Sequence, residues 1–168
     1  VYGPIRTDWR FVMTPLAFGK KPSLVVARFK DGHLLKGSTL DFFPNRDAFH
    51  IQPTDMASGA QPTPVKLSEL KAVFFVKSLA GDPNRKDAPP LSRKPGPSER
   101  PALVVFKDGE VITGGTLGYS PGRSGFFVTP LDLASNNERI YIVQDAVKTV
   151  RLLGPNESAA NVLKQMDL

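Results

Sequence analysis

The chain has 168 residues, 40% of them hydrophobic, and no cysteine. This apolar content is enough for a packed core and excludes a wholly disordered chain, while the absence of cysteine excludes disulfides, thiol catalysis and cysteine-based metal sites. The net charge of +6 favours an acidic partner.

Residues 1–22 are expected to form an extended arm that is both basic and aromatic. Trp9, Phe11 and Met13 alternate with Arg10 and Val12, which is the pattern of a β-strand. We expect the arm either to pack on the first repeat as an edge strand or to add a strand to a partner. Its candidate partner-binding residues are Arg6, Trp9, Arg10, Phe11, Leu16 and Phe18.

The arm also carries RTDWR, from Arg6 to Arg10, ahead of a small β-domain. This Arg-x-x-x-Arg spacing resembles the cyclic-di-GMP clamp of PilZ domains, and the resemblance implies two guanidinium groups that grip phosphates. PilZ domains also carry an Asp/Asn-x-Ser-x-x-Gly motif, whereas DFFPNRD stands at the corresponding place here. A cyclic-di-GMP sensor is therefore the alternative function, and a cyclic dinucleotide is not the expected principal ligand.

Residues 23–76 and 102–153 are two copies of one unit. The stretch FKDGHLLKGSTLDFFP at 29–44 recurs as FKDGEVITGGTLGYSP at 106–121, and the offset of 77 holds without a gap as far as Val73 and Val150. An ungapped match of this length predicts a duplicated domain.

Each copy has the pattern of a small all-β domain. In the first copy the strands are expected at 25–30, 34–42, 49–52, 65–67 and 71–76, with one 3₁₀ turn at 68–70. Asp31-Gly32 favours a two-residue type I′ hairpin turn. Gly37 and its counterpart Gly114 fall in mid-strand, where glycine marks a sharp bend.

The stretch LVVARFKDGHLLKGSTLDFF resembles the first half of an Sm motif, which implies two tandem five-stranded SH3-like or Sm-like small barrels. Sm proteins continue with an Asp-x-x-x-Asn type of base-binding loop, but this chain has PNRDA at 44–48 and PGRSG at 121–125. RNA binding is therefore the third candidate function, and nucleic acid is not the expected partner. The pattern, with LKAVFFV near the end of the first copy, is also similar to a bacterial domain of unknown function that often occurs in tandem.

Arg46 and Arg123 occupy the same place in the two copies, in a loop beside a proline. We consider them candidate anion-binding residues, because arginine pairs bidentately with phosphate or carboxylate. The alternative is a salt bridge within the loop. His33 and His50 are replaced by Glu110 and Phe127 in the second copy, so we assign them no catalytic or zinc-binding role.

Residues 77–101 contain six prolines and are expected to form a semi-rigid basic linker. Its candidate partner-binding residues are Arg85, Lys86, Arg93 and Lys94. The tail 154–168 is expected to be partly helical, with Asn156 as its cap and an apolar side formed by Ala159, Val162, Leu163 and Met166.

Together these features predict a non-enzymatic binding or assembly protein. No catalytic set recurs in both copies, and what recurs is mostly turn residues, glycines and core residues, so we expect no catalytic residue, no metal site and no cofactor. We expect an accessory subunit that docks on a larger protein complex, or at an anionic membrane surface, through its arm, linker and barrel edges. Such a protein would be cytoplasmic or peripheral to a membrane.

Overall fold

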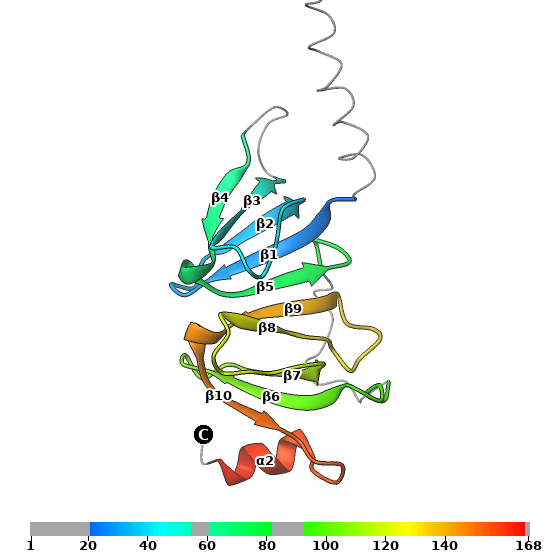
Figure 1. The fold of residues 1–168 in the computed structure, drawn as a ribbon. Coiled ribbons are helices and arrows are strands. Elements are labelled where there is room, and N and C mark those ends of the chain that lie inside the picture. Colours follow the sequence, from blue (N-terminus) through cyan, green and yellow to red (C-terminus); the bar gives the residue numbers. More distant parts are fainter. Residues whose placement is uncertain (1–20, 55–60, 82–92, 167–168) are drawn as a thin grey trace, which may run out of the picture.

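The computed structural model of the chain describes residues 21–54, 61–81 and 93–166. The protein is mostly β-sheet with one short C-terminal helix, and its larger sheet is curled like half of a barrel (Figure 1). The arm at 1–20 and the linker segment 82–92 lie outside the described residues.

The two copies contain the same elements in the same order. The first copy consists of β1 (Ser23–Phe29), β2 (Leu34–Thr39), β3 (Ala48–Pro53), β4 (Thr63–Lys66), the 3₁₀ turn η1 (Leu67–Glu69) and β5 (Leu70–Val76). The second copy consists of β6 (Arg100–Phe106), β7 (Val111–Thr116), β8 (Gly125–Val128), β9 (Asn137–Val143), η2 (Gln144–Ala146) and β10 (Val147–Leu152), and is followed by α2 (Ala159–Gln165). The expected strands and the 3₁₀ turn before the last strand are confirmed.

The strands of the two copies are combined in one larger and one smaller sheet. The larger has the order β4-β3-β2-β1-β5-β9-β8 and the smaller has the order β10-β6-β7. The copies join where β5 pairs with β9, with Val73 opposite Tyr141. β7 is connected to the chain that leaves β8 by an isolated bridge between Gly115 and Thr129, so the five strands of the second copy belong to two sheets. The all-β class is confirmed, while the two five-stranded barrels remain a prediction.

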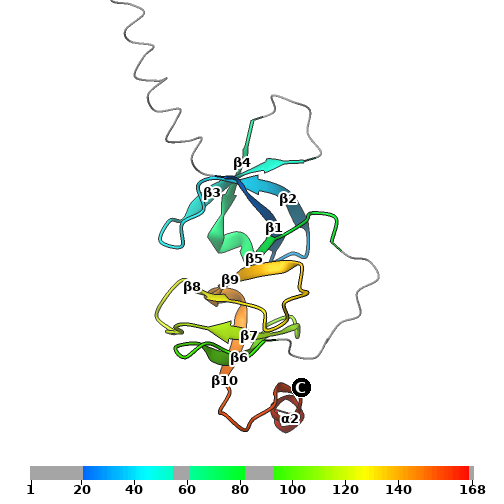
Figure 2. The ribbon, with the colours of Figure 1, turned by 90° about the vertical axis from the view of Figure 1, so that its right-hand side faces the viewer.

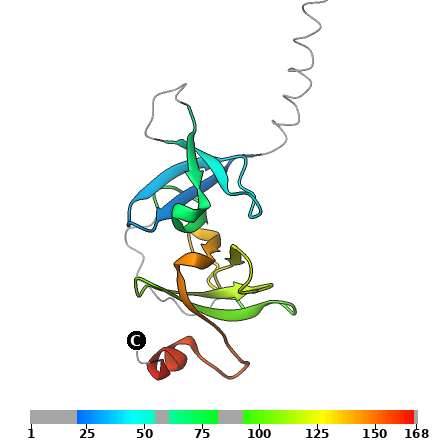
Figure 3. The same ribbon diagram turned by 60° about the vertical axis from the view of Figure 1, so that its left-hand side comes forward.

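Three hydrophobic cores are stacked along the molecule (Figures 1 and 2). The first contains Val25, Phe49, Ile51, Val73, Phe75 and Tyr141. The second contains Phe74, Val104, Phe106, Phe126, Ile140 and Ile142. The third contains Leu103, Val105, Leu153 and Val162, and it lies between the smaller sheet and α2 (Figure 3).

β5 lies between the first two cores. Val73 and Phe75 point into the first core, whereas Phe74 and Val76 point into the second, and all seven residues of the strand are buried. A strand buried on both faces needs a continuous apolar run instead of an alternating one. This requirement explains why LKAVFFV has no polar residue after Lys71.

The hairpin turns differ from the expected type. Gly32 N–H donates to Phe29 O and Phe29 N–H donates to His33 O, so the turn spans 29–32 and its last residue, Gly32, has a φ of 97°. This is a three-residue loop that ends in a left-handed glycine, so the predicted two-residue type I′ turn is wrong. The stabilising role of the aspartate is confirmed, because Asp31 accepts a hydrogen bond from His33 N–H at 3.0 Å.

Gly37 and Gly114 allow a close approach of two strands. A Cβ atom on Gly37 would overlap the carbonyl oxygen of Gln52 on β3, and one on Gly114 would lie 2.7 Å from the carbonyl oxygen of Thr129. The repeated glycines are therefore required by the crossing of the neighbouring strand. At the C-terminus, the cap of α2 is Ser158, whose side chain accepts from Asn161 N–H, and the expectation that Asn156 caps the helix is wrong.

Candidate functional site

The loops that carry Arg46 and Arg123 have the same backbone turn. Arg46 N–H donates to Phe43 O at 3.1 Å, and Arg123 N–H donates to Ser120 O at 3.2 Å. The two loops also touch each other, because the Ser124 hydroxyl donates to Pro44 O at 3.4 Å. The joint between the copies therefore brings together two loops that are 77 residues apart in the sequence.

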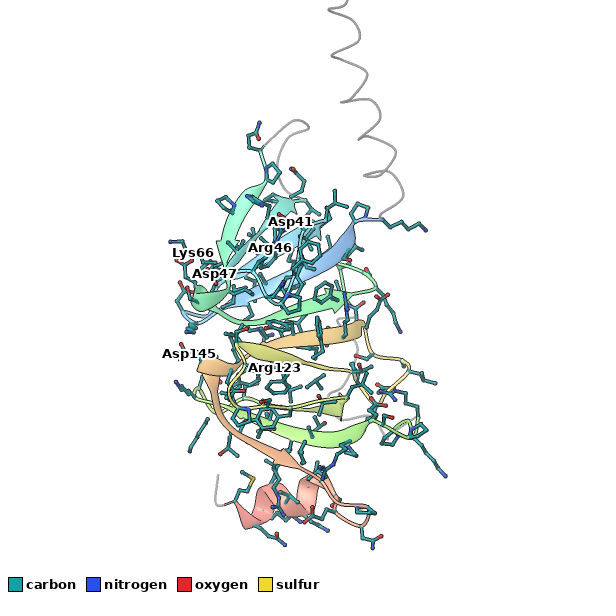
Figure 4. All side chains as sticks on the ribbon, in the orientation of Figure 1. Asp41, Arg46, Asp47, Lys66, Arg123 and Asp145 are labelled. Atoms are coloured by element: carbon teal, nitrogen blue, oxygen red, sulfur yellow. The ribbon has the colours of Figure 1, made fainter. Side chains whose placement is uncertain are left out.

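A hollow of about 750 Å³ lies at this joint. Its lining includes three basic side chains, Arg46, Lys66 and Arg123, and two acidic ones, Asp47 and Asp145. These five residues come from both copies and lie on one side of the molecule (Figure 4). We call this feature the joint hollow.

The basic side chains of the joint hollow are available to a ligand. The Arg46 guanidinium lies 4.8 Å from the centre of the Phe43 ring, in a cation–π contact that fixes its direction. Among the described residues, no carboxylate lies within ion-pair distance of Arg46, Lys66 or Arg123. Asp145 is already paired with Lys30 at 2.5 Å, and this hydrogen bond lowers the pKa of Asp145.

Gln144 is a further residue that lines the joint hollow. Its backbone N–H donates to Ser124 O at 2.9 Å, which places it against the second loop. Its side-chain oxygen is buried and has no hydrogen-bond partner in the described part of the chain. A buried acceptor without a donor lowers the stability of the folded chain.

An ion-pair cluster near the start of β5 clamps the two copies together. Arg28 donates to both carboxylate oxygens of Glu110 at 2.7 Å, and the buried Lys71 donates to Glu110 and, at 2.6 Å, to Asp108. Burial raises the pKa of Glu110, but the hydrogen bonds from Lys71 and Arg28 outweigh it and leave this pKa below its usual value. The Lys71 hydrogen bond likewise lowers the pKa of Asp108. These carboxylates therefore remain ionised at neutral pH, and their role is to hold the two copies together.

Two leucines at equivalent positions of the two copies are exposed, and the sequence did not predict their exposure. Leu40 and Leu117 occupy the same position in the two copies, and their exposed fractions are 50% and 81%. Leu117 lines a second hollow that also contains Arg123, Phe127 and Tyr141. The only signal in the sequence was their identity at the same offset, which is equally typical of core residues.

The other candidate residues are less available. Arg93 forms a bidentate ion pair with Glu99, at 2.6 and 2.7 Å, and its Nε donates to Pro130 O, so it fixes the end of the linker to the second copy. Lys94 lines a hollow of about 770 Å³ beside α2. The candidates outside the described residues are Arg6, Trp9, Arg10, Phe11, Leu16, Phe18, Arg85 and Lys86.

Both histidines lie on the surface and pair with a neighbouring aspartate. His33 Nδ1 is 2.5 Å from Asp31, and His50 Nδ1 is 2.7 Å from Asp41. The described residues include no group of three or more side chains able to hold a metal ion. They also include no helix of the length and apolar character that crossing a bilayer requires.

Comparison with known proteins gives one match. A family model described as a family of unknown function (DUF6982) covers residues 21–154, which span both copies. No curated protein and no solved structure matches the chain significantly.

Proposed function

We propose that this chain, which belongs to that family of unknown function, is a non-enzymatic binding and assembly protein. It acts as an accessory subunit that docks on a larger protein or membrane-associated complex. Its two copies serve as tandem small barrels of the SH3-like or Sm-like type, and they present loops and strand edges to the partner.

One observation carries this proposal: Arg46 and Arg123 line the same hollow. Two equivalent arginines in a duplicated chain would normally serve two separate surfaces. Here the joint places them together with Lys66, and no described carboxylate neutralises them. Guanidinium groups bind carboxylates in a bidentate manner, so the best-matched ligand is an acidic segment of a partner protein.

The exposed Leu117 supplies an apolar part of the same surface. Leu117 and Arg123 line one hollow, so an acidic side chain and an adjacent apolar side chain of the partner can be bound together. An exposed apolar anchor next to a charge is typical of a binding interface, where a few such residues supply most of the affinity.

The test is the retention of the native partner by variants with reversed charge. Native complexes are isolated at low salt with wild-type protein, with the double variant Arg46→Glu/Arg123→Glu, and with the control Lys36→Glu/Lys164→Glu. The control changes the net charge equally, but it does so at exposed positions outside the joint hollow.

We expect a stoichiometric partner to remain bound to the wild type and the control and to be lost from the double variant. Because the attraction is electrostatic, raising the ionic strength should also release it. Equal retention by all three proteins would show that the joint hollow does not carry the interface. Turnover of a substrate by the purified chain would refute the non-enzymatic assignment.

A further inference from the structure

The two copies differ in the last strand, because β5 lies inside a sheet and β10 lies at the edge of one. β5 and β10 are equivalent strands, with Val73 and Phe75 matching Val150 and Leu152. β5 has a neighbour on each side, β1 and β9. In the described part of the chain β10 pairs with β6 alone, so the position that β9 occupies beside β5 has no occupant beside β10.

The backbone groups at this edge point outward. Leu153 N–H donates to Pro101 O at 2.8 Å, toward the side of β6. Successive residues of a strand direct their N–H and C=O groups to opposite sides, so those of Val150 and Leu152 face away from β6. In the first copy the counterpart of Val150 is Val73, which lies opposite Tyr141 of β9.

The edge strands β4, of the larger sheet, and β10, of the smaller sheet, differ in their proline content. β4 contains Pro64, and Pro62 directly precedes it. Proline cannot donate a backbone hydrogen bond and protects a strand edge from pairing. β10 contains no proline, so its edge is open to a further strand.

The first copy also shows which side chain such a strand must bring. Tyr141 of β9 packs against Phe42, with ring centres 5.2 Å apart, and completes the first core. The counterpart of Phe42 is Tyr119, which packs on Phe126 and stays partly exposed. A strand that enters beside β10 would therefore present an aromatic residue at the place that Tyr141 takes in the first copy.

Charge determines the chemistry of the partner. The exposed side chains of β10 are Lys148 and Arg151, and the strand contains no acidic residue. Arg151 contacts Glu157 at 2.9 Å, and its other donors have no partner among the residues that the structure describes. At the joint the residue opposite Phe74, which is the counterpart of Arg151, is Ile140. An acidic residue at that position would face Arg151.

From these observations we infer that the free edge of β10 binds an extended, acidic strand of a partner protein, antiparallel and with an aromatic residue opposite Val150. This inference rests on the proposed docking function and names where one partner segment binds. A second copy of the chain fits less well, because its β4 edge contains Pro64 and carries Lys66 but no acidic residue.

A peptide copied from β9 tests the inference directly. The probe is the fluorescein-labelled heptapeptide NEREYIV, which is the sequence of 137–143 with the change Ile140→Glu, and the matched probe NERKYIV carries Ile140→Lys. Each is titrated into the full chain and followed by fluorescence anisotropy. We expect the Glu peptide to bind at least about fivefold more tightly than the Lys peptide, and Arg151→Glu to reverse this order.

N-methylation of the peptide separates strand pairing from simple charge attraction. A methyl group on the backbone nitrogen of the peptide's tyrosine removes the N–H donor that faces Val150 and should weaken binding at least about tenfold. The same methyl group on the Glu nitrogen, which faces away from β10, should have little effect. Bound peptide should also slow amide hydrogen exchange at Val150 and Leu152 and leave that at Arg151 unchanged.

Three results would overturn the inference: no binding of either peptide up to ~1 mM, equal binding of the two N-methylated peptides, or an unchanged preference in Arg151→Glu. Self-association of the full chain that is lost in Arg151→Glu would assign the edge to a second copy instead. The joint-hollow variants keep Arg151, so peptide binding is independent of them. If the peptide fails but those variants still lose the native partner, the proposed function stands and only the role of the β10 edge falls.

Discussion

Replacing Glu110 by glutamine should show how strongly the ion-pair cluster holds the two copies together. The change keeps the shape of the side chain and removes its charge, while Arg28 and the nearly buried Lys71, whose side chain is 6% exposed, remain. A hydrogen bond to a charged group contributes about 1.5–3 kcal/mol, and Glu110 accepts from two cations. Its side chain is 38% exposed, so solvent screening reduces the sum.

We therefore expect Glu110→Gln to lower the free energy of unfolding by about 2 kcal/mol at pH 7. The assay is urea denaturation followed by circular dichroism, because urea does not screen charges as guanidinium chloride does. Glu138→Gln is the matched control, since Glu138 is exposed on β9 and forms no ion pair within the described part of the chain. The control should leave the free energy of unfolding nearly unchanged.

The pH dependence adds an independent check. In the folded protein the pKa of Glu110 lies below its ordinary value of 4.5, because the hydrogen bonds from Lys71 and Arg28 outweigh burial. A carboxyl group with a lowered folded pKa stabilises the protein fully above its unfolded pKa, and this stabilisation is lost as the pH falls through the folded value. The difference between wild type and Glu110→Gln should thus be constant above about pH 4.5 and shrink below it. A difference that is absent at pH 7, or undiminished near pH 3, would refute this account.

Three further predictions concern other parts of the chain. Gly114→Ala should lower the free energy of unfolding by about 1–3 kcal/mol, since its Cβ would meet the Thr129 carbonyl; Gly118→Ala, which has open space around it, is the control, and equal stability of the two would contradict the prediction. Removing residues 156–168 should uncover Leu103, Val105 and Leu153, and it should raise binding of a hydrophobic dye and cause concentration-dependent association in sedimentation; a monomer without increased dye binding would oppose this. Calorimetry at ~50 µM protein should detect no saturable heat with cyclic-di-GMP, whereas a heat that disappears in Arg6→Ala would support the sensor alternative.

Local sequence patterns predicted much of the fold. The offset of 77 identified the duplication. The alternation of apolar and polar residues and the glycines in the turns located the strands, because these two patterns reflect interactions between residues close in the chain. They could not predict the pairing of β5 with β9, which depends on how two similar units associate. The unbroken run after Lys71 in LKAVFFV was the one local indication that both faces of β5 are buried.

The candidate site was harder to predict. Arg46 and Arg123 were identified by their repetition, but the sequence could not show that they line one hollow. Lys71 and Lys148 are identical in the sequence, yet Lys71 is buried at the joint and Lys148 is exposed at a free edge. A duplicated residue loses its equivalence once the copies associate asymmetrically, and that asymmetry is encoded only in the tertiary contacts.

The sharing of β5 and β9 between two cores has a consequence for how the protein unfolds and evolves. Tyr141 and Val143 of the second copy complete the core of the first, while Ala72 and Phe74 of the first copy complete the core of the second. Neither half buries a full core by itself, so heating should produce one cooperative transition with equal calorimetric and van't Hoff enthalpies. A chain that lost one copy would therefore expose part of the core of the other, which selects against the loss of either copy.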